Sequence, residues 1–233
     1  MRSLLLIICA LCALHVSAQI YHARKVAKGS IIPDGKGSSP AWRQADQLTD
    51  FVYPWDSAVA PPTSFAALWD GDWFYGLFRV KDDSVVTLVK SNDKMDVGGS
   101  DRVEIFLKKD DAMNPYYCLE MDADGRVLDY NAFYYRKVNY PWHWPDGQLI
   151  IKASRAADGY IVEFAISVKS LNEFGLVQDH RLQAGLFRGQ HPAPGTPRRA
   201  NGWVDLRWIS WIRPKSNFPD FHIPSAFGTL ILD

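Results

Sequence analysis

The sequence has few cysteines and no net charge. Of its three Cys residues, Cys9 and Cys12 lie in an apolar N-terminal segment, so beyond that segment only Cys118 remains. A disulfide within the rest of the chain is therefore excluded, and the fold must be held by its core, with or without a metal. Basic and acidic residues number 26 each, which does not favour nucleic acid or an anionic membrane as a partner.

Motifs of several enzyme classes are also missing. The chain has no Gly-x-Ser-x-Gly turn, so serine-hydrolase chemistry of that type has no support. It has no Gly-rich phosphate loop. Its histidines are scattered without the spacing of zinc ligands, so the sequence does not predict a zinc site; they include His143, His180, His191 and His222.

Long hydrophobic runs are absent except at the N-terminus. Residues 4–14 are apolar and Arg2 precedes them. The residues Val16-Ser17-Ala18 that follow resemble a small-residue cleavage site. This pattern predicts a signal peptide over residues 1–18, cleaved near Ala18, and one domain over residues 19–233 that is secreted, periplasmic or on the cell surface. A lipoprotein anchor at Cys9 or Cys12 is the alternative, but no small residue precedes either in the usual pattern. No later segment has transmembrane length.

Aromatic residues, in contrast, are abundant: the chain has nine Trp, ten Tyr and twelve Phe. Because Trp is rarely buried completely, some of these rings are expected at the surface. On an exported protein, exposed rings suggest stacking on the flat apolar face of a ligand such as a sugar. The alternative is a β-sandwich core rich in aromatic residues.

Two strands are predicted within residues 101–122. Val103, Ile105 and Leu107 alternate with polar or aromatic residues, and the same period of two continues over residues 116–122. If the pair closes with Leu107 opposite Tyr117, then Glu104 faces Glu120 on the side away from the aliphatic residues. That side is either a solvated surface or a polar binding platform.

The remaining sequence predicts an all-β protein. About ten short strands are separated by turn signals such as Asp70-Gly71 and Asp158-Gly159, and one short helix is expected over residues 167–174. Residues 190–202 are expected to form a loop because of their Pro and Gly content. The predicted fold is an antiparallel β-sandwich of the jelly-roll or immunoglobulin-like type.

Five segments in order resemble one family. They are the Trp69-Asp70 segment up to Asp82, the D-x-V-E-I-F block at residues 101–106, the Y-Y-x-x-E strand at 116–120, the G-Y-x-V-E-x-A-I strand at 159–166, and the closing segment from Trp211 to Gly228. The chain thereby resembles carbohydrate-binding module family 9 from residue 32 to residue 232. The resemblance implies a β-sandwich that binds sugar chain ends beside hydrolases of xylan or cellulose, and in some members binds calcium.

The resemblance also implies site residues. Glu104 matches an acid that contacts sugar, and Glu120 lies on the strand beside it. One of the two clamping Trp rings of the family is replaced by Gly98 or Gly99, while Phe221 matches the other. The predicted carbohydrate site is Arg102, Glu104, Glu120, Trp144, Trp211, Phe221 and His222, with Trp142 as an alternative to Trp144.

Other readings remain open. Two facing carboxylates about 5 Å apart are what a retaining glycoside hydrolase needs, so Glu104 and Glu120 could act as acid and base. Met113 or Met121 could ligate haem, because a haem-binding group shares this sandwich type. A chain that only holds other proteins together is a third alternative. Loop carboxylates could bind calcium without a defined motif; they are Asp93, Asp96, Asp101, Asp110, Asp111, Asp122 and Asp124.

Overall fold

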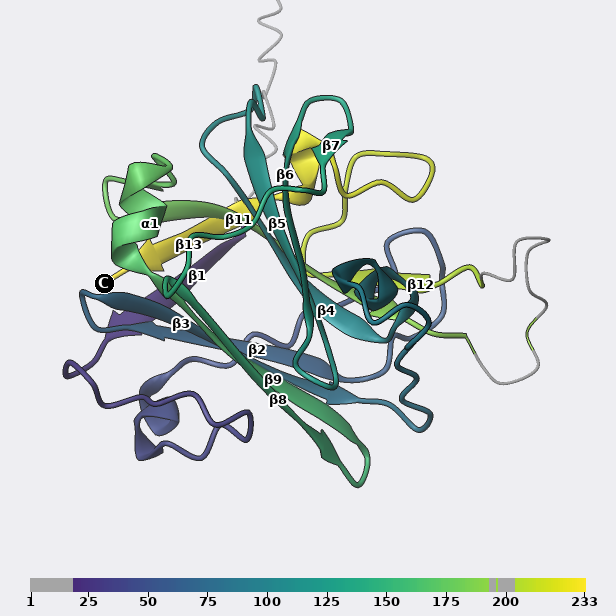
Figure 1. Cartoon of the computed structure of the whole chain (residues 1–233), viewed down its shortest axis with the longest axis horizontal. Helices are drawn as coiled ribbons and strands as arrows, with labels where there is room; N and C mark the ends of the chain where they lie inside the picture. Colours follow the sequence, from purple (N-terminus) through teal and green to yellow (C-terminus); the bar gives the residue numbers. More distant parts are fainter. Residues whose placement is uncertain (1–18, 193–195, 197–203) are drawn as a thin grey trace, which may run out of the picture.

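The computed structural model describes residues 19–192, 196 and 204–233 (Figure 1). The predicted signal peptide and most of the predicted loop at residues 190–202 lie outside these residues. The strands are β1 (Ile20–Lys25), β2 (Thr63–Trp69), β3 (Trp73–Lys81), β4 (Arg102–Lys108), β5 (Tyr116–Asp122), β6 (Val127–Phe133), β7 (Lys137–Asn139), β8 (Leu149–Ala156), β9 (Gly159–Ser167), β10 (Val177–Gln178), β11 (Arg181–Gln190), β12 (Arg207–Ser210) and β13 (Gly228–Leu232).

The strands form two layers. The first sheet has the order β7-β6-β5-β4-β11-β13-β1, with β10 and β12 also paired to β11. The second has the order β1-β2-β3-β9-β8. Figure 1 shows β2, β3, β9 and β8 in the lower half of the view, and β5, β6 and β11 above them. Strand β1 belongs to both layers, because residues 20–23 pair with β13 and residues 24–25 pair with β2.

The predicted β-sandwich is confirmed, but its details differ. The described residues contain thirteen strands, not about ten, and three short 3-10 turns accompany the single α-helix. Three of the strands, β7, β10 and β12, have only two to four residues, which is too short for a period of two to be read from sequence. The jelly-roll or immunoglobulin-like type is not matched, because β1 runs parallel to both of its neighbours.

The predicted helix is present. It is α1 (Val168–Glu173), capped by the Ser167 side chain, which accepts a hydrogen bond from the Ser170 backbone N–H. Gly175 follows with φ of 66°, a left-handed conformation that favours glycine at a helix end.

The main core lies between the two sheets. It contains the alternating aliphatic side chains of β4 and β5, including Val103, Ile105 and Leu107, packed with Phe78 and Phe164 of the second sheet. The register of β4 and β5 is the predicted one, since Leu107 pairs with Tyr117 and Glu104 with Glu120. The two glutamates therefore point away from the main core.

The outer face of the first sheet is itself largely covered. A second buried cluster includes Phe106, Tyr116, Tyr130, Phe187 and Phe221. This cluster surrounds the outward side chains of β4 and β5, so the face predicted as a solvated surface or a platform is a partly enclosed pocket.

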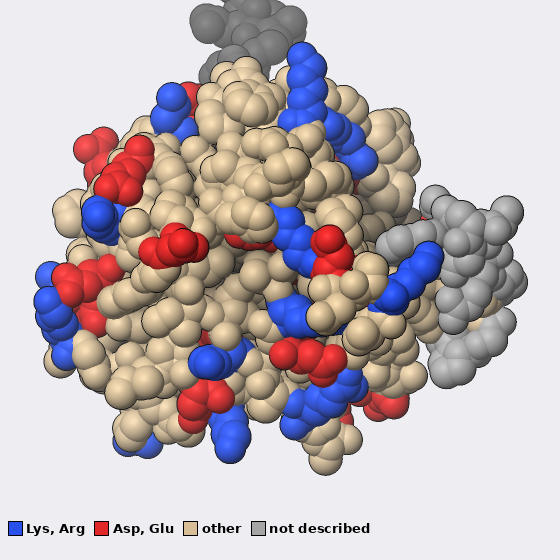
Figure 2. All heavy atoms as spheres, viewed as in Figure 1, with Lys and Arg blue, Asp and Glu red and all other residues tan. Residues whose placement is uncertain are grey.

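Surface charge is mixed. Figure 2 shows Lys and Arg interspersed with Asp and Glu over the visible face, with no large area of one sign. Within the described residues, no helix has the length and apolar character needed to cross a membrane.

Candidate functional site

A cavity of about 490 Å³ opens on the outer face of β4 and β5. Strands β4 and β5 supply its floor, β12 and the segment before the last 3-10 turn supply its walls, and Arg136 comes from the β6–β7 hairpin. Its lining residues are Trp55, Arg102, Glu104, Phe106, Glu120, Arg136, Asp205, Leu206, Trp208, Pro219, Asp220, Phe221 and His222.

The floor carries three buried ionisable groups. Arg102 Nε lies 2.8 Å from Glu104 Oε1 and 2.7 Å from Glu120 Oε2. Arg102 also donates a hydrogen bond to the Gly98 carbonyl at 2.8 Å, and the Tyr130 hydroxyl donates to Glu120 Oε1 at 2.8 Å. Arg102, Glu104 and Glu120 are 4%, 1% and 6% exposed. The period of two that orients Glu104 outward also orients Arg102 and Phe106, so one strand supplies three groups of the floor.

Two buried carboxylates share one guanidinium, and this affects their protonation. Burial, and next the nearby Glu120 carboxylate, raise the pKa of Glu104 to about 8, although Arg102 opposes the shift. At neutral pH Glu104 is therefore mostly a neutral acid. A protonated carboxyl can donate as well as accept a hydrogen bond, which suits a ligand rich in hydroxyl groups.

Aromatic rings form the wall above this floor. Phe221 stacks on Phe187 with ring centroids 4.0 Å apart and an angle of 10° between the rings. Trp55 and Trp208 lie 5.3 Å and 5.6 Å from Phe221. Both Trp side chains remain partly exposed, and Trp208 also lies over the Arg102 guanidinium at 5.2 Å.

His222 closes one end of the cavity. Its Nδ1 lies 2.8 Å from the Tyr116 hydroxyl, and its ring contacts Phe106 at 5.2 Å. Burial lowers the pKa of His222 to about 4, and the positive charge of Arg136 acts in the same direction. His222 is therefore neutral at physiological pH and is a hydrogen-bonding group rather than a cation.

Arg136 and Asp220 form the rim. Arg136 Nη2 lies 2.8 Å from Asp220 Oδ1, and the Tyr135 hydroxyl donates to Asp220 Oδ2 at 2.5 Å. Burial opposes ionisation of Asp220, but the hydrogen bonds from Tyr135, Arg136 and the His222 backbone together lower its pKa. The rim is thus a fixed ion pair beside the rings.

Five of the seven predicted site residues meet in this cavity: Arg102, Glu104, Glu120, Phe221 and His222. Trp211 and Trp144 do not. Trp211 is 3% exposed in the main core, where it packs against Gly228. Trp144 is 4% exposed, donates from Nε1 to Ser170 Oγ at 3.0 Å, and packs beside Phe174. Trp142, the alternative to Trp144, packs beside it.

Sequence reasoning missed Trp55, Trp208 and Arg136. The signal for Trp208 was available, because Ile209 faces the core and its neighbour in a strand must face outward. Trp55 lies in an irregular segment and Arg136 in a hairpin turn, where no periodic pattern exists. Gly98 stands at or next to the position where the resemblance places a clamping Trp, and it has no side chain. Its carbonyl accepts a hydrogen bond from Arg102, and the ring of Trp208 lies over the guanidinium of Arg102.

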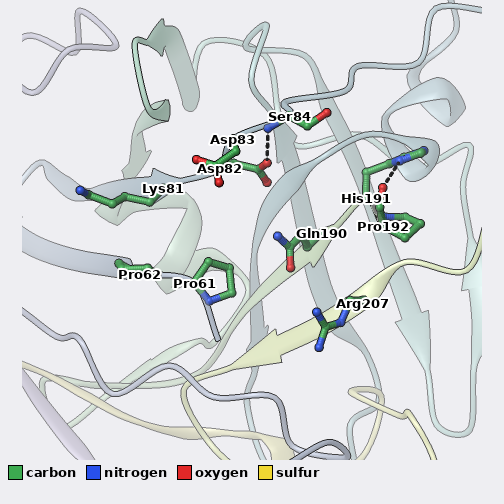
Figure 3. A pocket seen from close by; sticks show the side chains of 10 residues that line it. All are labelled: Pro61, Pro62, Lys81, Asp82, Asp83, Ser84, Gln190, His191, Pro192 and Arg207. Atoms are coloured by element: carbon green, nitrogen blue, oxygen red, sulfur yellow. Dashed lines mark hydrogen bonds between the residues drawn. The ribbon is translucent and has the colours of Figure 1, made fainter. Parts of the chain in front are cut away.

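Not every cavity combines aromatic rings with charged groups. Figure 3 shows one of about 400 Å³ that contains Lys81, Asp82, Asp83, Gln190 and Arg207 but no Phe, Tyr or Trp among its lining residues. Asp82 is already paired with the buried Arg188 at 2.6 Å. Arg188 pairs with Val103, whose side chain faces the main core, so Arg188 lies on the opposite face of the first sheet from the two glutamates.

The loop carboxylates considered for calcium have partners within the protein. Asp96 accepts hydrogen bonds from the backbone of Lys90, Ser91 and Asn92, and Asp122 pairs with Arg126 at 2.6 Å. Among the described residues, no group of three or more His, Cys, Asp or Glu side chains is arranged to hold a metal ion.

The two methionines considered for haem are both completely buried. Met121 packs in the main core and Met113 in the second cluster, on the other side of the first sheet. They act as packing residues, which is the common role of a buried Met.

Comparisons with solved structures show where this fold has been seen before. A candidate carbohydrate-binding protein from Bacteroides uniformis has a TM-score of 0.70 at 19% identity, covering 93% of this chain and 100% of that one. Two structures of a carbohydrate-binding module family 9 from Caldicellulosiruptor kristjanssonii are also similar. The complex with glucose has a TM-score of 0.58 at 17% identity, covering 92% and 96%, and the complex with cellotriose 0.56 at 16%, covering 92% and 94%.

No curated protein matches the sequence. The family model described as "Carbohydrate family 9 binding domain-like", however, matches residues 32–233. This range includes every strand except β1, and all the lining residues of the cavity on β4 and β5. The chain therefore belongs to the carbohydrate family 9 binding domain-like family.

Proposed function

We propose that the protein binds carbohydrate in the cavity on β4 and β5 without cleaving it. The observation that carries the proposal is the adjacency of three rings, Trp55, Trp208 and Phe221, to a floor of buried hydrogen-bonding groups. A sugar has apolar C–H faces and a periphery of hydroxyls. The rings would bind the faces, while Glu104, Glu120 and Arg102 would bind the hydroxyls.

The family and the chemistry of the cavity support a proposal for the ligand class. We propose plant-type polysaccharides such as xylan or cellulose, or their oligosaccharides, bound through a chain end. The glucose and cellotriose bound by the module from Caldicellulosiruptor kristjanssonii support this class. We further propose that the protein is exported, with residues 1–18 as its signal peptide, and works beside glycoside hydrolases.

Isothermal titration calorimetry against xylan, cellulose and their oligosaccharides tests the proposal. Wild-type protein should bind at least one series, and Trp208→Ala should weaken binding by about tenfold or more, as for a central aromatic contact. Trp73→Ala is the matched control, since Trp73 is also partly exposed but lines a different cavity. The proposal fails if the wild type binds no glycan, or if both variants behave alike.

Glycoside hydrolysis is the second candidate. The raised pKa of Glu104 beside Glu120 is what a general acid next to a nucleophile requires. The shared contact of both carboxylates with Arg102 favours binding instead, because a nucleophile held by a guanidinium has to lose that contact to react. Release of reducing sugar by the wild type, abolished in Glu104→Gln, would establish hydrolysis.

A further inference from the structure

Tyr116 is a buried residue of β5 that reaches the cavity through His222. It precedes Cys118 and Glu120 on the same strand at a spacing of two, so all three side chains are on the outer face of the first sheet. Its side chain packs in the second buried cluster and is not among the lining residues of the cavity. Its hydroxyl lies 2.8 Å from Nδ1 of His222, which does line the cavity.

The direction of this hydrogen bond follows from the burial of both groups. Burial raises the pKa of the Tyr116 hydroxyl, so it keeps its proton, and among the described residues His222 Nδ1 is the one acceptor that it meets. Burial and next Arg136 lower the pKa of His222 to about 4, against the effect of Asp220, so the ring is neutral and has one proton. A proton on Nδ1 would leave the buried phenol without an acceptor, which is costly. The phenol therefore donates to Nδ1, and the ring proton is on Nε2.

The remaining contacts of His222 orient Nε2 toward the cavity. Its backbone N–H donates to Asp220 at 2.9 Å, and its ring packs against Phe106 at 5.2 Å. Within the described part of the chain, Nε2 has no hydrogen-bond partner, yet it is not one of the buried side-chain atoms that lack one. Since the residue is partly exposed and lines the cavity, Nε2–H is an accessible donor there.

We propose that Tyr116 is a positioning residue of the carbohydrate site, whose hydroxyl holds His222 in the tautomer and orientation that present Nε2–H to an oxygen of the bound sugar. This inference rests on the proposed function and deepens it. It makes His222 a neutral donor to the ligand and gives a role in recognition to a tyrosine outside the cavity lining.

The surrounding charges fit a neutral sugar oxygen as the acceptor. Arg102 is already shared by the two carboxylates of the floor, and Arg136 is paired with Asp220 at 2.8 Å. Both guanidiniums are thus compensated by carboxylates of the protein, whereas Nε2–H of His222 is an uncharged donor. A hydroxyl or ring oxygen satisfies such a donor without bringing a further charge into the cavity.

Nuclear magnetic resonance of the ¹⁵N-labelled protein without ligand measures the tautomer, because long-range correlations within the ring distinguish the protonated nitrogen. His222→Gln identifies the signals of this residue. Near pH 7 the wild type should carry the ring proton on Nε2. Tyr116→Phe should shift the Nδ1 resonance and let the Nδ1–H tautomer become populated. A wild-type proton on Nδ1, or a ring spectrum that Tyr116→Phe leaves unchanged, would overturn the inference.

Calorimetry with the tightest-binding glycan tests the role in recognition. Tyr116→Phe should weaken binding by about tenfold, as for the loss of one well-placed hydrogen bond to the ligand. His222→Gln keeps an N–H donor, and its amide has no tautomer for Tyr116 to select. In the His222→Gln background, Tyr116→Phe should therefore weaken binding by less than about twofold.

Tyr75→Phe is the matched control. Tyr75 is also buried, at 3% exposed, and its hydroxyl donates to Asp70 at 2.9 Å on the second sheet. It loses a buried hydrogen bond of the same kind and should bind glycan like the wild type. If Tyr116→Phe binds like Tyr75→Phe, or costs as much in the His222→Gln background as in the wild type, the positioning role is wrong while the proposed function stands. If the wild type binds no glycan, both fail.

Discussion

Glu104 is a buried acid whose protonation differs between the folded and unfolded chain. Its pKa is raised from 4.5 to about 8 in the folded state by burial and by Glu120. Between these values the folded chain binds a proton that the unfolded chain has lost, so this group's contribution to stability falls as pH rises. His222 has the opposite sign, because its pKa is lowered from 6.5 to about 4.

His222 adds the same pH dependence to the wild type and to Glu104→Gln, and this contribution fades as the pH rises past 6.5, so a difference between the two proteins reports Glu104. We predict that the free energy of unfolding contributed by Glu104 decreases from pH 6.5 to pH 8, and that Glu104→Gln flattens this slope. Burial raises the pKa of Cys118 and of Tyr130 well above their usual values, so neither neighbour titrates in this range. Urea denaturation at both pH values measures the difference.

Glu173→Gln is the control for that experiment, since Glu173 is exposed and only 3.8 Å from Lys169. It should leave the slope as in the wild type. An equal slope in the wild type and in Glu104→Gln would show that Glu104 is ionised in the folded protein.

Five of the seven residues predicted for the site line the cavity on β4 and β5, and two do not. Glu104 and Glu120 follow from alternation plus a hairpin register, which are local properties. Trp211 was predicted because it stands in a family motif, yet it packs in the main core together with Ile209. Burial depends on strands distant in sequence, and a motif alone does not report it.

At the scale of elements, the Glu163 side chain of β9 holds the irregular segment at residues 34–42 by hydrogen bonds. Glu163 is completely buried and accepts hydrogen bonds from the backbone N–H groups of Asp34 and Gly35, at 2.9 Å and 3.0 Å. It also accepts from Nε1 of Trp42 at 2.9 Å. Trp42 is therefore buried in the short turn at residues 40–44, against the outer face of the second sheet.

We predict that Glu163→Ala lowers the free energy of unfolding by about 3 kcal/mol, because it leaves several buried donors without an acceptor. Glu163→Gln retains an acceptor oxygen and should lose less. Thermal unfolding monitored by circular dichroism measures both. A loss below about 0.5 kcal/mol in Glu163→Ala would mean that water replaces the carboxylate.

Long strands were predictable and short ones were not. Strands β4, β5 and β9 have seven to nine residues and alternate visibly, so their positions and the β4–β5 register were correct. Strand β10 has two residues and exists only because it pairs with β11. Residues 85–89 are mostly apolar but form no strand, because the backbone N–H groups of Val86 and Leu88 donate to the side chains of Asp101 and Ser100.

At the scale of the molecule, one ion pair links the two sheets. Arg188 of β11 is completely buried and lies 2.6 Å from Asp82, which directly follows β3. It also donates to Thr63 of β2 at 3.1 Å. Removing one partner leaves the other charge buried and alone, which is far more costly than removing both.

We predict that Arg188→Met lowers the free energy of unfolding by about 3 kcal/mol or more, and that the double variant Arg188→Met with Asp82→Leu is less destabilised than Arg188→Met alone. Urea denaturation of the three proteins measures the coupling. Purely additive losses would contradict a buried pair and would indicate that solvent reaches Asp82.

Strand β1 has a consequence for how the molecule assembles. Ile20 pairs with Thr229, so the seam between the layers joins the two extremes of the described chain. Contacts so distant in sequence carry a large loop-closure cost and belong to the slow part of folding. Until β13 (residues 228–232) pairs with them, β1 and β11 each expose an unpaired strand edge. A strand of another incompletely folded molecule could pair with such an edge and start an aggregate.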